Sequence, residues 1–278
     1  MLEKTVGVLP EEEKSNAQWQ AAYWNDRFKK SDPWGAEASP VVQEIFRHSN
    51  KLRPDSAIVT FGCGLGRDEL QLAKEERCFI NGFDICRVGI NKAAERIEAD
   101  PQTSSYLGER IWFTLANVTT FPSLREAWAD VFASNRVVHL LEKDEVKRFV
   151  KQAVFTAKED ALIAITARSF LDFDPNSMEW INESEGLALR DDGVITRFWN
   201  SEMFRQHFEY AVDISEIAPV EEPDTIESGR NTQLLLMTGY RLPDANIKKN
   251  IKQGQHSRSK NGHNGTSAEA AVTESLAP

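Results

Sequence analysis

The sequence has few cysteines, no excess of positive charge and no long apolar run. Its 278 residues include 3 cysteines, and 43 aspartates and glutamates outnumber 33 lysines and arginines, so the formal net charge is −10. The cysteines fit no metal-ligand spacing, so no metal site is expected. The negative charge argues against a nucleic-acid partner. The lack of an apolar run of membrane length argues against a membrane-spanning protein.

The start of the chain also lacks the pattern of a signal peptide. MLEKTVGVLPEEEK is acidic and contains no basic stretch followed by an apolar one. Cys63, Cys78 and Cys86 lie in or beside apolar segments, which is typical of buried, reduced thiols in a cytoplasmic protein. Hydrophobic residues make up 41% of the chain, enough for a sizeable core. We therefore expect a cytoplasmic protein that is a monomer or a weak dimer.

A glycine-rich turn follows the first strongly apolar segment. Residues 57–61 read as a buried strand, Gly62, Gly64 and Gly66 come next, and a helical pattern begins at Arg67. Such a turn lets the backbone approach a ligand and directs free N–H groups at it. The dinucleotide fingerprint would need glycine at position 67, which disfavours a nicotinamide or flavin cofactor. A purely structural turn is the alternative.

The next apolar segment, residues 77–85, carries an acidic residue near its end. Asp84 follows Gly66 by about 18 residues. A carboxylate at this place can accept hydrogen bonds from a ribose diol, and its charge would repel a 2′-phosphate. Together with the glycine turn, Asp84 predicts a site for an adenosine-containing cofactor. An exposed strand-end cap is the alternative.

These residues carry a resemblance to a known superfamily. FGCGLGR followed by GFDICRVGINKAAER resembles the cofactor-binding half of class I S-adenosylmethionine-dependent methyltransferases, over roughly residues 19–242. The resemblance implies S-adenosylmethionine as cofactor, held by the glycine turn with Phe61 and Cys63 and by Asp84 with Ile85. The family usually has an acidic residue where this chain has Thr60. A hydroxyl cannot balance the cofactor's positive charge, so another group would have to supply a negative one.

Aromatic residues recur at helical spacing near the beginning of the chain. Residues 15–30 predict a helix, and a loop with Trp34 follows. WQAAYWNDRF and PWG resemble the N-terminal segment of the thiopurine, tellurite and related thiol methyltransferases, which folds over the cofactor. The resemblance implies that Trp24 and Trp34 contact the cofactor from a lid formed by residues 15–50. Packing of the helix against the core is the alternative.

Strand and helix patterns alternate along most of the chain, which predicts an α/β fold with a doubly wound, Rossmann-like sheet. Seven strands are expected, mostly parallel, and the resemblance makes the last one antiparallel. Residues 168–191 read as a loop. We expect a flexible leader (1–14), a methyltransferase domain (15–243) and a disordered tail (244–278) with almost no large apolar residues. The expected strands lie at 57–61, 77–85, 111–118, 130–135, 161–167, 211–217 and 233–241.

Further candidates follow the third and fourth strands, because open α/β sheets bind ligands beyond the carboxyl ends of their strands. The superfamily often has an acidic or amide side chain near the adenine amine, which here implies Asn117 with Val118. Asn135 and Arg136 resemble the Asp-Arg pair of the thiopurine group. That likeness implies that Arg136 contacts the methionine carboxylate or a substrate anion. The alternative for Asn117 is a turn residue, and the alternative for Arg136 is a solvated charge at a helix start.

His139, one helical turn after Arg136, and Asp172, after the fifth strand, are the other candidate catalytic residues. The alternative for His139 is a packed histidine, and the alternative for Asp172 is a place in an ordered surface loop. Neither residue belongs to a strong general-base constellation, which favours a thiolate or another soft nucleophile that needs little deprotonation. Near-attack positioning alone can be worth roughly 7–11 kcal/mol.

Four functions follow in order of preference. The first is methylation of a small molecule at a thiol or other soft nucleophile. The second is N- or O-methylation of a small metabolite, with Asp172, Asp174 or His139 as base. The third is a non-catalytic cofactor-binding module, suggested by Thr60. A nucleic-acid methyltransferase comes last, because the chain is acidic and has SNRV in place of the Asn/Asp-Pro-Pro-aromatic tetrapeptide.

Overall fold

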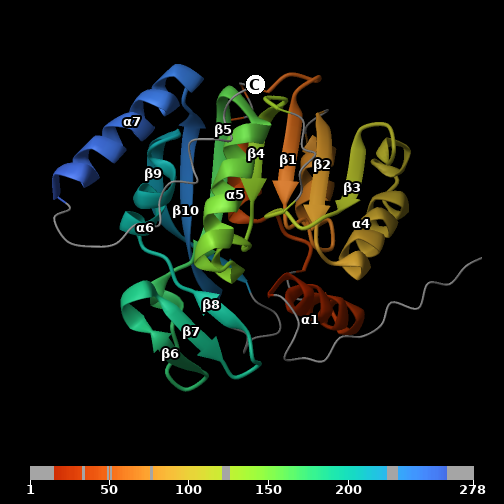
Figure 1. The fold of residues 1–278 in the computed structure, drawn as a ribbon. Coiled ribbons are helices and arrows are strands. Elements are labelled where there is room, and N and C mark those ends of the chain that lie inside the picture. Colours follow the sequence, from red (N-terminus) through yellow and green to blue (C-terminus); the bar gives the residue numbers. More distant parts are fainter. Residues whose placement is uncertain are drawn as a thin grey trace, which may run out of the picture.

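The computed structural model describes residues 16–32, 35–48, 50, 52–75, 78–120, 126–223 and 231–261. Strands and helices alternate along most of this part of the chain (Figure 1). The helices are α1 (Asn16–Lys30), α2 (Pro40–Arg47), α3 (Arg67–Glu75), α4 (Arg87–Ala99), α5 (Lys143–Thr156), α6 (Ser201–Phe208) and α7 (Asp244–Asn261). The strands are β1 (Ala57–Phe61), β2 (Phe79–Asp84), β3 (Ile111–Leu115), β4 (Ala129–Ser134), β5 (Ala157–Arg168), β6 (Met178–Asn182), β7 (Leu187–Arg190), β8 (Ile195–Arg197), β9 (Val212–Pro223) and β10 (Asn231–Arg241).

The large sheet has seven strands in the order β3-β2-β1-β4-β5-β10-β9. Strands β1 to β5 pair in parallel, and β10 is antiparallel to both of its neighbours. The predicted seven-strand, mostly parallel α/β fold is therefore confirmed. The strand order reverses beside β1, and a crevice for ligands is expected there at the carboxyl ends.

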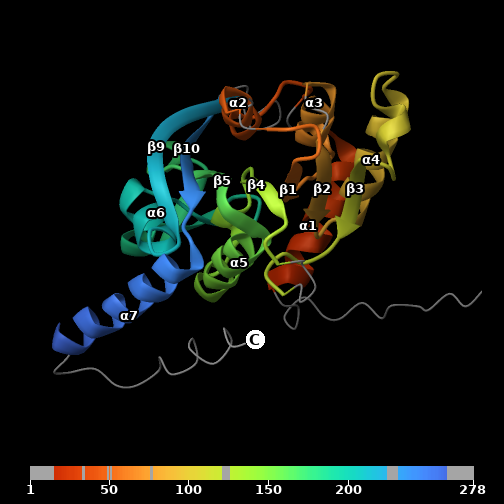
Figure 2. The same cartoon turned by 90° about the horizontal axis from the view of Figure 1, so that it is seen from above.

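Alternate residues of the central strands face two different helical layers. In β1, Val59 packs into a core with helices α5 and α6, whereas Ile58 packs into a core with α2, α3 and α4. Figure 2 shows the sheet between these two layers. Burial on both faces explains why the central strands read as continuous apolar runs.

Local signals fix where the helices begin. The Ser39 hydroxyl accepts a hydrogen bond from the backbone N–H of Val42 (3.3 Å), and Pro40 occupies the first turn of α2. Glu142 and Glu145 form a capping box at the start of α5. These caps place α2 and α5 against opposite faces of the sheet.

The segment 168–191 was predicted to be a loop, and this prediction is wrong. It contains β6 and β7, which form a three-stranded antiparallel sheet with β8. Aromatic packing gives this small sheet its own core, because Trp180 stacks on Phe173 with ring centroids 4.0 Å apart and meets Phe198 at 5.5 Å. Figure 1 shows the small sheet and α1 beyond the carboxyl ends of the parallel strands.

The expected disordered tail from residue 244 is also corrected. Helix α7 begins at Asp244, and Ile247 is buried. The amide of Asn250 donates to the backbone oxygen of Tyr210 (3.1 Å). One buried isoleucine and a few polar bonds anchor the helix, a signal too small for composition to detect. The expected leader 1–14 and residues 262–278 lie outside the described residues.

Within the part of the chain that the structure describes, no helix combines the length and apolar character needed to cross a membrane.

Candidate functional site

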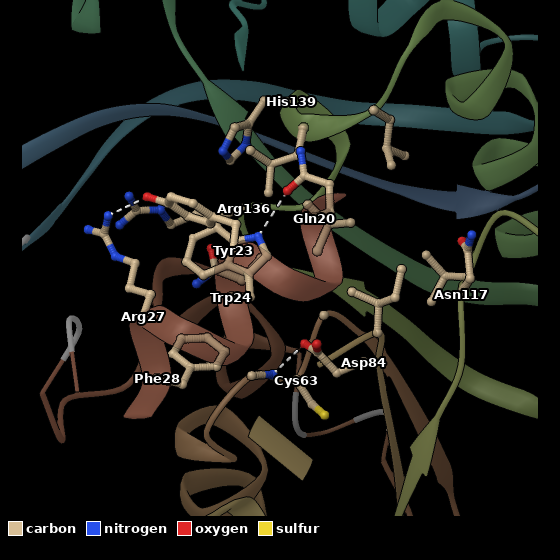
Figure 3. A pocket seen from close by; sticks show the side chains of 18 of the residues that line it. Gln20, Tyr23, Trp24, Arg27, Phe28, Cys63, Asp84, Asn117, Arg136 and His139 are labelled. Atoms are coloured by element: carbon tan, nitrogen blue, oxygen red, sulfur yellow. Dashed lines mark hydrogen bonds between the residues drawn. The ribbon is translucent and has the colours of Figure 1, made fainter. Parts of the chain in front are cut away.

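A pocket lies at the carboxyl ends of the parallel strands, between the large sheet and α1 (Figure 3). Its lining comes from the glycine turn, from the residues that follow β2, β3 and β4, from α1 and α5, and from the small sheet. Of the predicted site residues, those that line it are Trp24, Gly62, Cys63, Gly64, Asp84, Ile85, Asn117, Val118, Asn135, Arg136 and His139.

The glycine turn is held by backbone hydrogen bonds to the end of β2. The N–H groups of Gly62 and Cys63 both donate to the carbonyl oxygen of Phe83, at 2.7 and 3.1 Å. Gly62 has a φ of +78°, and a Cβ there would lie 2.0 Å from Cγ2 of Val137. Glycine is needed here because the residues after β4 approach the turn closely.

Phe61 and Gly66 were predicted to bind the cofactor, but neither lines the pocket. Phe61 packs in the core, edge-on to Phe132 with centroids 4.7 Å apart. A Cβ on Gly66 would lie 2.7 Å from the Cβ of Ala93 in α4. Gly66 therefore serves the close packing of α4 behind the turn.

Asp84 joins the end of β2 to the glycine turn. Its Oδ2 accepts from the N–H of Gly64 (2.8 Å), and its Oδ1 accepts from the N–H of Cys86 (2.7 Å). The side chain is not the exposed cap of the alternative interpretation, because only 8% of the residue is accessible. Burial raises the pKa of Asp84 to about 6, against the opposing effect of these N–H donors. Each oxygen keeps a lone pair that can accept another hydrogen bond from a ligand.

Asn117 lines the pocket and also makes the turn after β3. Its Oδ1 accepts from the N–H (2.9 Å) and the hydroxyl (2.8 Å) of Thr119. The turn role and the pocket role are therefore compatible. Apolar Ile85 and Val118 line the wall nearby.

A buried acid stands next to Thr60. The Thr60 hydroxyl donates to Oε1 of Glu69, a fully buried residue in the first turn of α3. Burial, reinforced by Asp68, raises the pKa of Glu69 to about 8. Glu69 Oε2 has no hydrogen-bond partner among the described residues. Helix α3 thus supplies the carboxyl group that the strand lacks, a contact that motif spacing alone does not reveal.

Two arginines at the pocket share one buried carboxylate. Glu222, which is 1% exposed, binds Arg67 (2.6 Å), Arg136 (3.4 Å) and the amide of Asn135 (3.1 Å). Arg67 also pairs with Asp68 (3.1 Å). Only 10% of the Arg136 side chain is accessible, so it is not a solvated charge. Sequence reasoning missed Glu222 because β9 extends beyond the predicted residue 217.

His139 is a buried histidine in the pocket wall. It is 4% exposed, and its Nδ1 has no hydrogen-bond partner among the described residues. Burial lowers its pKa well below the usual range, and the positive charges of Arg168, Arg136 and Arg190 act in the same direction. The imidazole is therefore neutral near pH 7 and can accept a hydrogen bond.

Asp172 does not line the pocket. Its Oδ1 accepts from the N–H of Gln233 (2.9 Å), and its Oδ2 lies 3.3 Å from Nε of Arg168. Both groups are buried, so the aspartate serves the fold rather than a reaction in the pocket. Asp174 bonds the N–H of Asn176 (3.0 Å). Trp34 lies outside the described residues.

Side chains of α1 meet the small sheet at one end of the pocket. The Tyr23 hydroxyl donates to Oδ2 of Asp192 (2.7 Å) and accepts from Arg27 (2.6 Å). The same Oδ2 lies 3.0 Å from Arg190 and 3.6 Å from Arg27. Burial, together with the bond to Asp192, raises the pKa of Tyr23 to about 12, so the phenol keeps its proton.

Trp24 lies on the same helix and lines the pocket. Its indole N–H donates to Oε1 of Gln20 (3.1 Å), and its ring packs on Phe28 with centroids 5.4 Å apart. Helix α1 therefore covers the strand ends with aromatic rings, as Figure 3 shows for Tyr23, Trp24 and Phe28.

Comparison with known proteins identifies the fold. No protein-family model matches the chain. Methyltransferase GfsG of Streptomyces halstedii is 21% identical over 150 residues, which are 54% of this chain and 51% of that protein. The chain thus spans about half the length of the curated relative it matches.

Two solved structures are similar over most of the chain. One, described for the conversion of a disulfide bond into a thioacetal group during echinomycin biosynthesis, has a TM-score of 0.61 at 16% identity and covers 85% of this chain and 99% of its own. The other is the 1,6-didemethyltoxoflavin-N1-methyltransferase of Burkholderia thailandensis, with bound 1,6-didemethyltoxoflavin and S-adenosylhomocysteine. It has a TM-score of 0.59 at 16% identity, and the match covers 82% of this chain and 87% of that enzyme. The chain has the class I methyltransferase fold. Membership of the thiopurine and tellurite group stays a prediction.

Proposed function

We propose that this chain is a cytoplasmic S-adenosylmethionine-dependent methyltransferase that acts on a small molecule, with a thiol or another soft nucleophile as the acceptor. One observation carries the proposal. The glycine turn, Asp84 and Asn117 meet in one pocket at the carboxyl ends of the strands of a class I methyltransferase fold. The naming of GfsG as a methyltransferase supports it. So does S-adenosylhomocysteine beside a small molecule in the toxoflavin enzyme.

The residues present fit the cofactor. The backbone of Gly62 and Gly64 forms a cradle without side chains, and Asp84 has acceptor capacity for ribose hydroxyls. Asn117 lies at the adenine edge of this arrangement, between apolar residues that suit a flat ring. When bound, S-adenosylmethionine supplies an activated methyl group, because its sulfonium sulfur leaves as a neutral thioether.

Glu69 can supply the negative charge that Thr60 does not. The cofactor carries positive charge, and a cation nearby favours the ionised form of a buried carboxyl group. Glu69 does not itself line the pocket, but it binds Thr60, two residues before Gly62, so its carboxyl group lies beside the strand that leads into the glycine turn. We assign to Glu69 the role that an acidic residue at position 60 would have. The feature that motivated a non-catalytic module is thereby weakened.

The remaining residues position the acceptor and exclude water. Helix α1 and the small sheet close the pocket through Tyr23 and Asp192, and Trp24 covers the strand ends. A closed, dry pocket favours methyl transfer because water around a nucleophile slows it. The seat for the methionine carboxylate is assigned to Arg136, which Glu222 orients.

N- or O-methylation of a small metabolite is the second candidate, and His139 is the observation that favours it. An amine or hydroxyl acceptor loses a proton when it is methylated. A neutral imidazole with an unpartnered Nδ1 in the pocket wall can take that proton. The same residue would serve a thiol, so His139 does not decide between the two acceptor types.

The proposal is tested by a methyl-transfer screen with labelled cofactor against thiols, selenite, tellurite, halides and amines, read by mass spectrometry. We expect a methylated thiol and no labelled product from the Gly64→Val variant. Labelled amines alone would favour the second candidate. Cofactor binding measured by calorimetry without any transfer would support a non-catalytic module, and the absence of binding would refute the proposal.

A further inference from the structure

We infer that the methyl acceptor is an organic monocarboxylate whose charge binds between Arg27 and Arg190, at the end of the pocket where α1 meets the small sheet. The identity of this anion as the methyl acceptor rests on the proposed function, whereas the anion seat itself does not. Figure 3 shows Tyr23 and Arg27 well separated from Asn117, so the seat is distinct from the adenosine end.

The first step is a local concentration of positive charge. Arg27 and Arg190 both line the pocket, and both pair with the same oxygen of Asp192, at 3.6 and 3.0 Å. Two guanidinium groups therefore converge on one carboxylate oxygen. Their side chains are only 16% and 11% accessible, so water screens this charge poorly. A ligand carboxylate that enters the pocket here meets both guanidinium groups. Arginine can bind a carboxylate in a bidentate manner, through two parallel hydrogen bonds.

Other charged side chains that line the pocket have partners within the fold. Arg67 and Arg136 are matched by Glu222 and Asp68. Asp32 pairs with Arg96. The Glu222 side chain is 1% accessible and that of Asp192 is 28% accessible, so the charges at the end formed by α1 and β7 are the ones that a ligand can reach.

Glu145 is the remaining acid near this end. Its carboxylate accepts from the amide of Asn16 (2.6 Å) and from the backbone N–H of Glu142 (3.0 Å), as part of the α5 cap. That role is fulfilled within the fold. An acid with two donors of its own does not compete with a ligand for Arg27 and Arg190.

The second step places the seat beside the proposed proton acceptor. Strand β8 of the small sheet packs against Val138–Leu140, the segment that carries His139, and both Arg190 and His139 line the pocket. An acceptor anchored by Arg190 thus brings its body to the imidazole. The walls between them are apolar, from Leu140, Leu141 and Val194, and the faces of Tyr23 and Trp24 lie on the α1 side. Two guanidinium groups beside one aspartate, together with apolar walls, favour a monoanion with a hydrophobic or aromatic body.

Three probes of one shape test the inference: benzoate, neutral benzamide and cationic benzamidine. Each is titrated calorimetrically into the full chain, with and without S-adenosylhomocysteine. We expect benzoate to bind at least about tenfold more tightly than benzamide, and benzamidine to bind weakest. Arg190→Gln should remove this preference, and Arg190→Lys should keep part of it. Arg205→Gln, at an exposed position on α6, is the matched control and should leave it intact.

Asp192→Asn is the most decisive variant, because the predicted change in benzoate affinity is opposite in direction to the change that structural damage would cause. Removing the shared carboxylate should strengthen benzoate binding, whereas simple disruption of the α1 contact would weaken it. Equal binding of benzoate and benzamide, no benzoate binding, or tighter benzamidine binding would overturn the inference. A loss of S-adenosylhomocysteine affinity in Arg190→Gln with the benzoate preference retained would also overturn it. The titrations without S-adenosylhomocysteine distinguish a failure of the anion seat from a failure of the cofactor assignment.

Discussion

The two ends of the pocket are held by different kinds of contact. At the cofactor end, a backbone N–H of the glycine turn meets Asp84 across 20 residues of sequence. At the acceptor end, the Tyr23 hydroxyl meets Asp192 across 169 residues. The first arrangement follows from a strand, a tight turn and a second strand in register. The second depends on side chains of α1 and of the small sheet, which lie outside the large sheet.

The largest effect is expected from Gly64→Val, which separates ligand binding at the cofactor end from folding. Gly64 lines the pocket with a φ of +53°, so a branched side chain would be strained and would fill the cradle. We expect no detectable binding of S-adenosylhomocysteine by calorimetry, with a melting temperature lowered by only a few degrees.

Gly66→Ala is the comparison for that variant. Its Cβ would meet both Cα (2.9 Å) and Cβ (2.7 Å) of Ala93, so it should lower the melting temperature more than Gly64→Val does. Retained S-adenosylhomocysteine binding by Gly64→Val would contradict the assignment of the turn to the cofactor.

At the acceptor end, His139→Gln should lower turnover with an amine or hydroxyl acceptor by roughly 10²–10⁴-fold, the range for loss of a general base, and turnover with a thiolate by less. The affinity for S-adenosylhomocysteine should stay within about twofold, because His139 is assigned to the acceptor. His207→Gln is the matched control, since that histidine packs against Trp199 (ring centroids 5.4 Å apart) and does not line the pocket. Full turnover of the His139 variant would show that His139 only packs in the pocket wall.

Asp84→Asn should weaken binding of S-adenosylhomocysteine by about 1.5–3 kcal/mol, since it removes charge-assisted hydrogen bonds to the ribose. The wild-type pKa of about 6 sets the pH dependence. The ionised carboxylate accepts from the ribose, so affinity should fall as the pH drops through 6, and the variant should lack this fall. Calorimetry at pH 5 and 8 measures both. An affinity equal to that of the wild type would show that Asp84 serves the turn alone.

The smallest effect is expected from Glu69→Gln, which should weaken S-adenosylhomocysteine binding by at most about tenfold. The loss should be larger at pH 9 than at pH 7, because the pKa of about 8 leaves Glu69 mostly protonated at pH 7. An identical loss at both values would argue against a charge effect.

Glu69 also has a signature in stability without ligand. Its folded pKa is raised above the unfolded value, so the folded protein binds the extra proton between the two values. The contribution of Glu69 to the free energy of unfolding should therefore decline as the pH rises from about 4.5 to 8. Denaturant unfolding of Glu69→Gln should show a flatter pH dependence over this range.

What the sequence could predict follows the same division between the two ends. The β1–turn–β2 unit was predictable because its signals are local: apolar runs, glycines at fixed spacing and an acid at a strand end. Asn117, Asn135 and Arg136 were implied by the resemblance, and their meeting in one pocket was predictable because parallel strands end at one edge of the sheet. The parallel pairing of β1 with β2 and β4, and of β2 with β3, agrees with these expectations.

The rest was not predictable from local pattern. Glu69 binds Thr60 through a contact between a helix and a strand, which motif spacing does not show. Glu222 and Asp192 bind arginines of the pocket wall, and they come from elements whose length and form the sequence did not indicate. Asp172 looked catalytic from its place after β5, yet its burial against Arg168 makes it structural. Long-range pairing of side chains decides these cases.

Calorimetric titration of the intact chain with S-adenosylhomocysteine, beside an identical titration with nicotinamide adenine dinucleotide, tests the central claim most directly. The glycine turn with Arg67 in place of the last glycine of the dinucleotide fingerprint, and Asp84 at the end of β2, predict saturable one-to-one binding of S-adenosylhomocysteine and none of the dinucleotide. No heat with S-adenosylhomocysteine, or preferential binding of the dinucleotide, would contradict the assignment of the pocket.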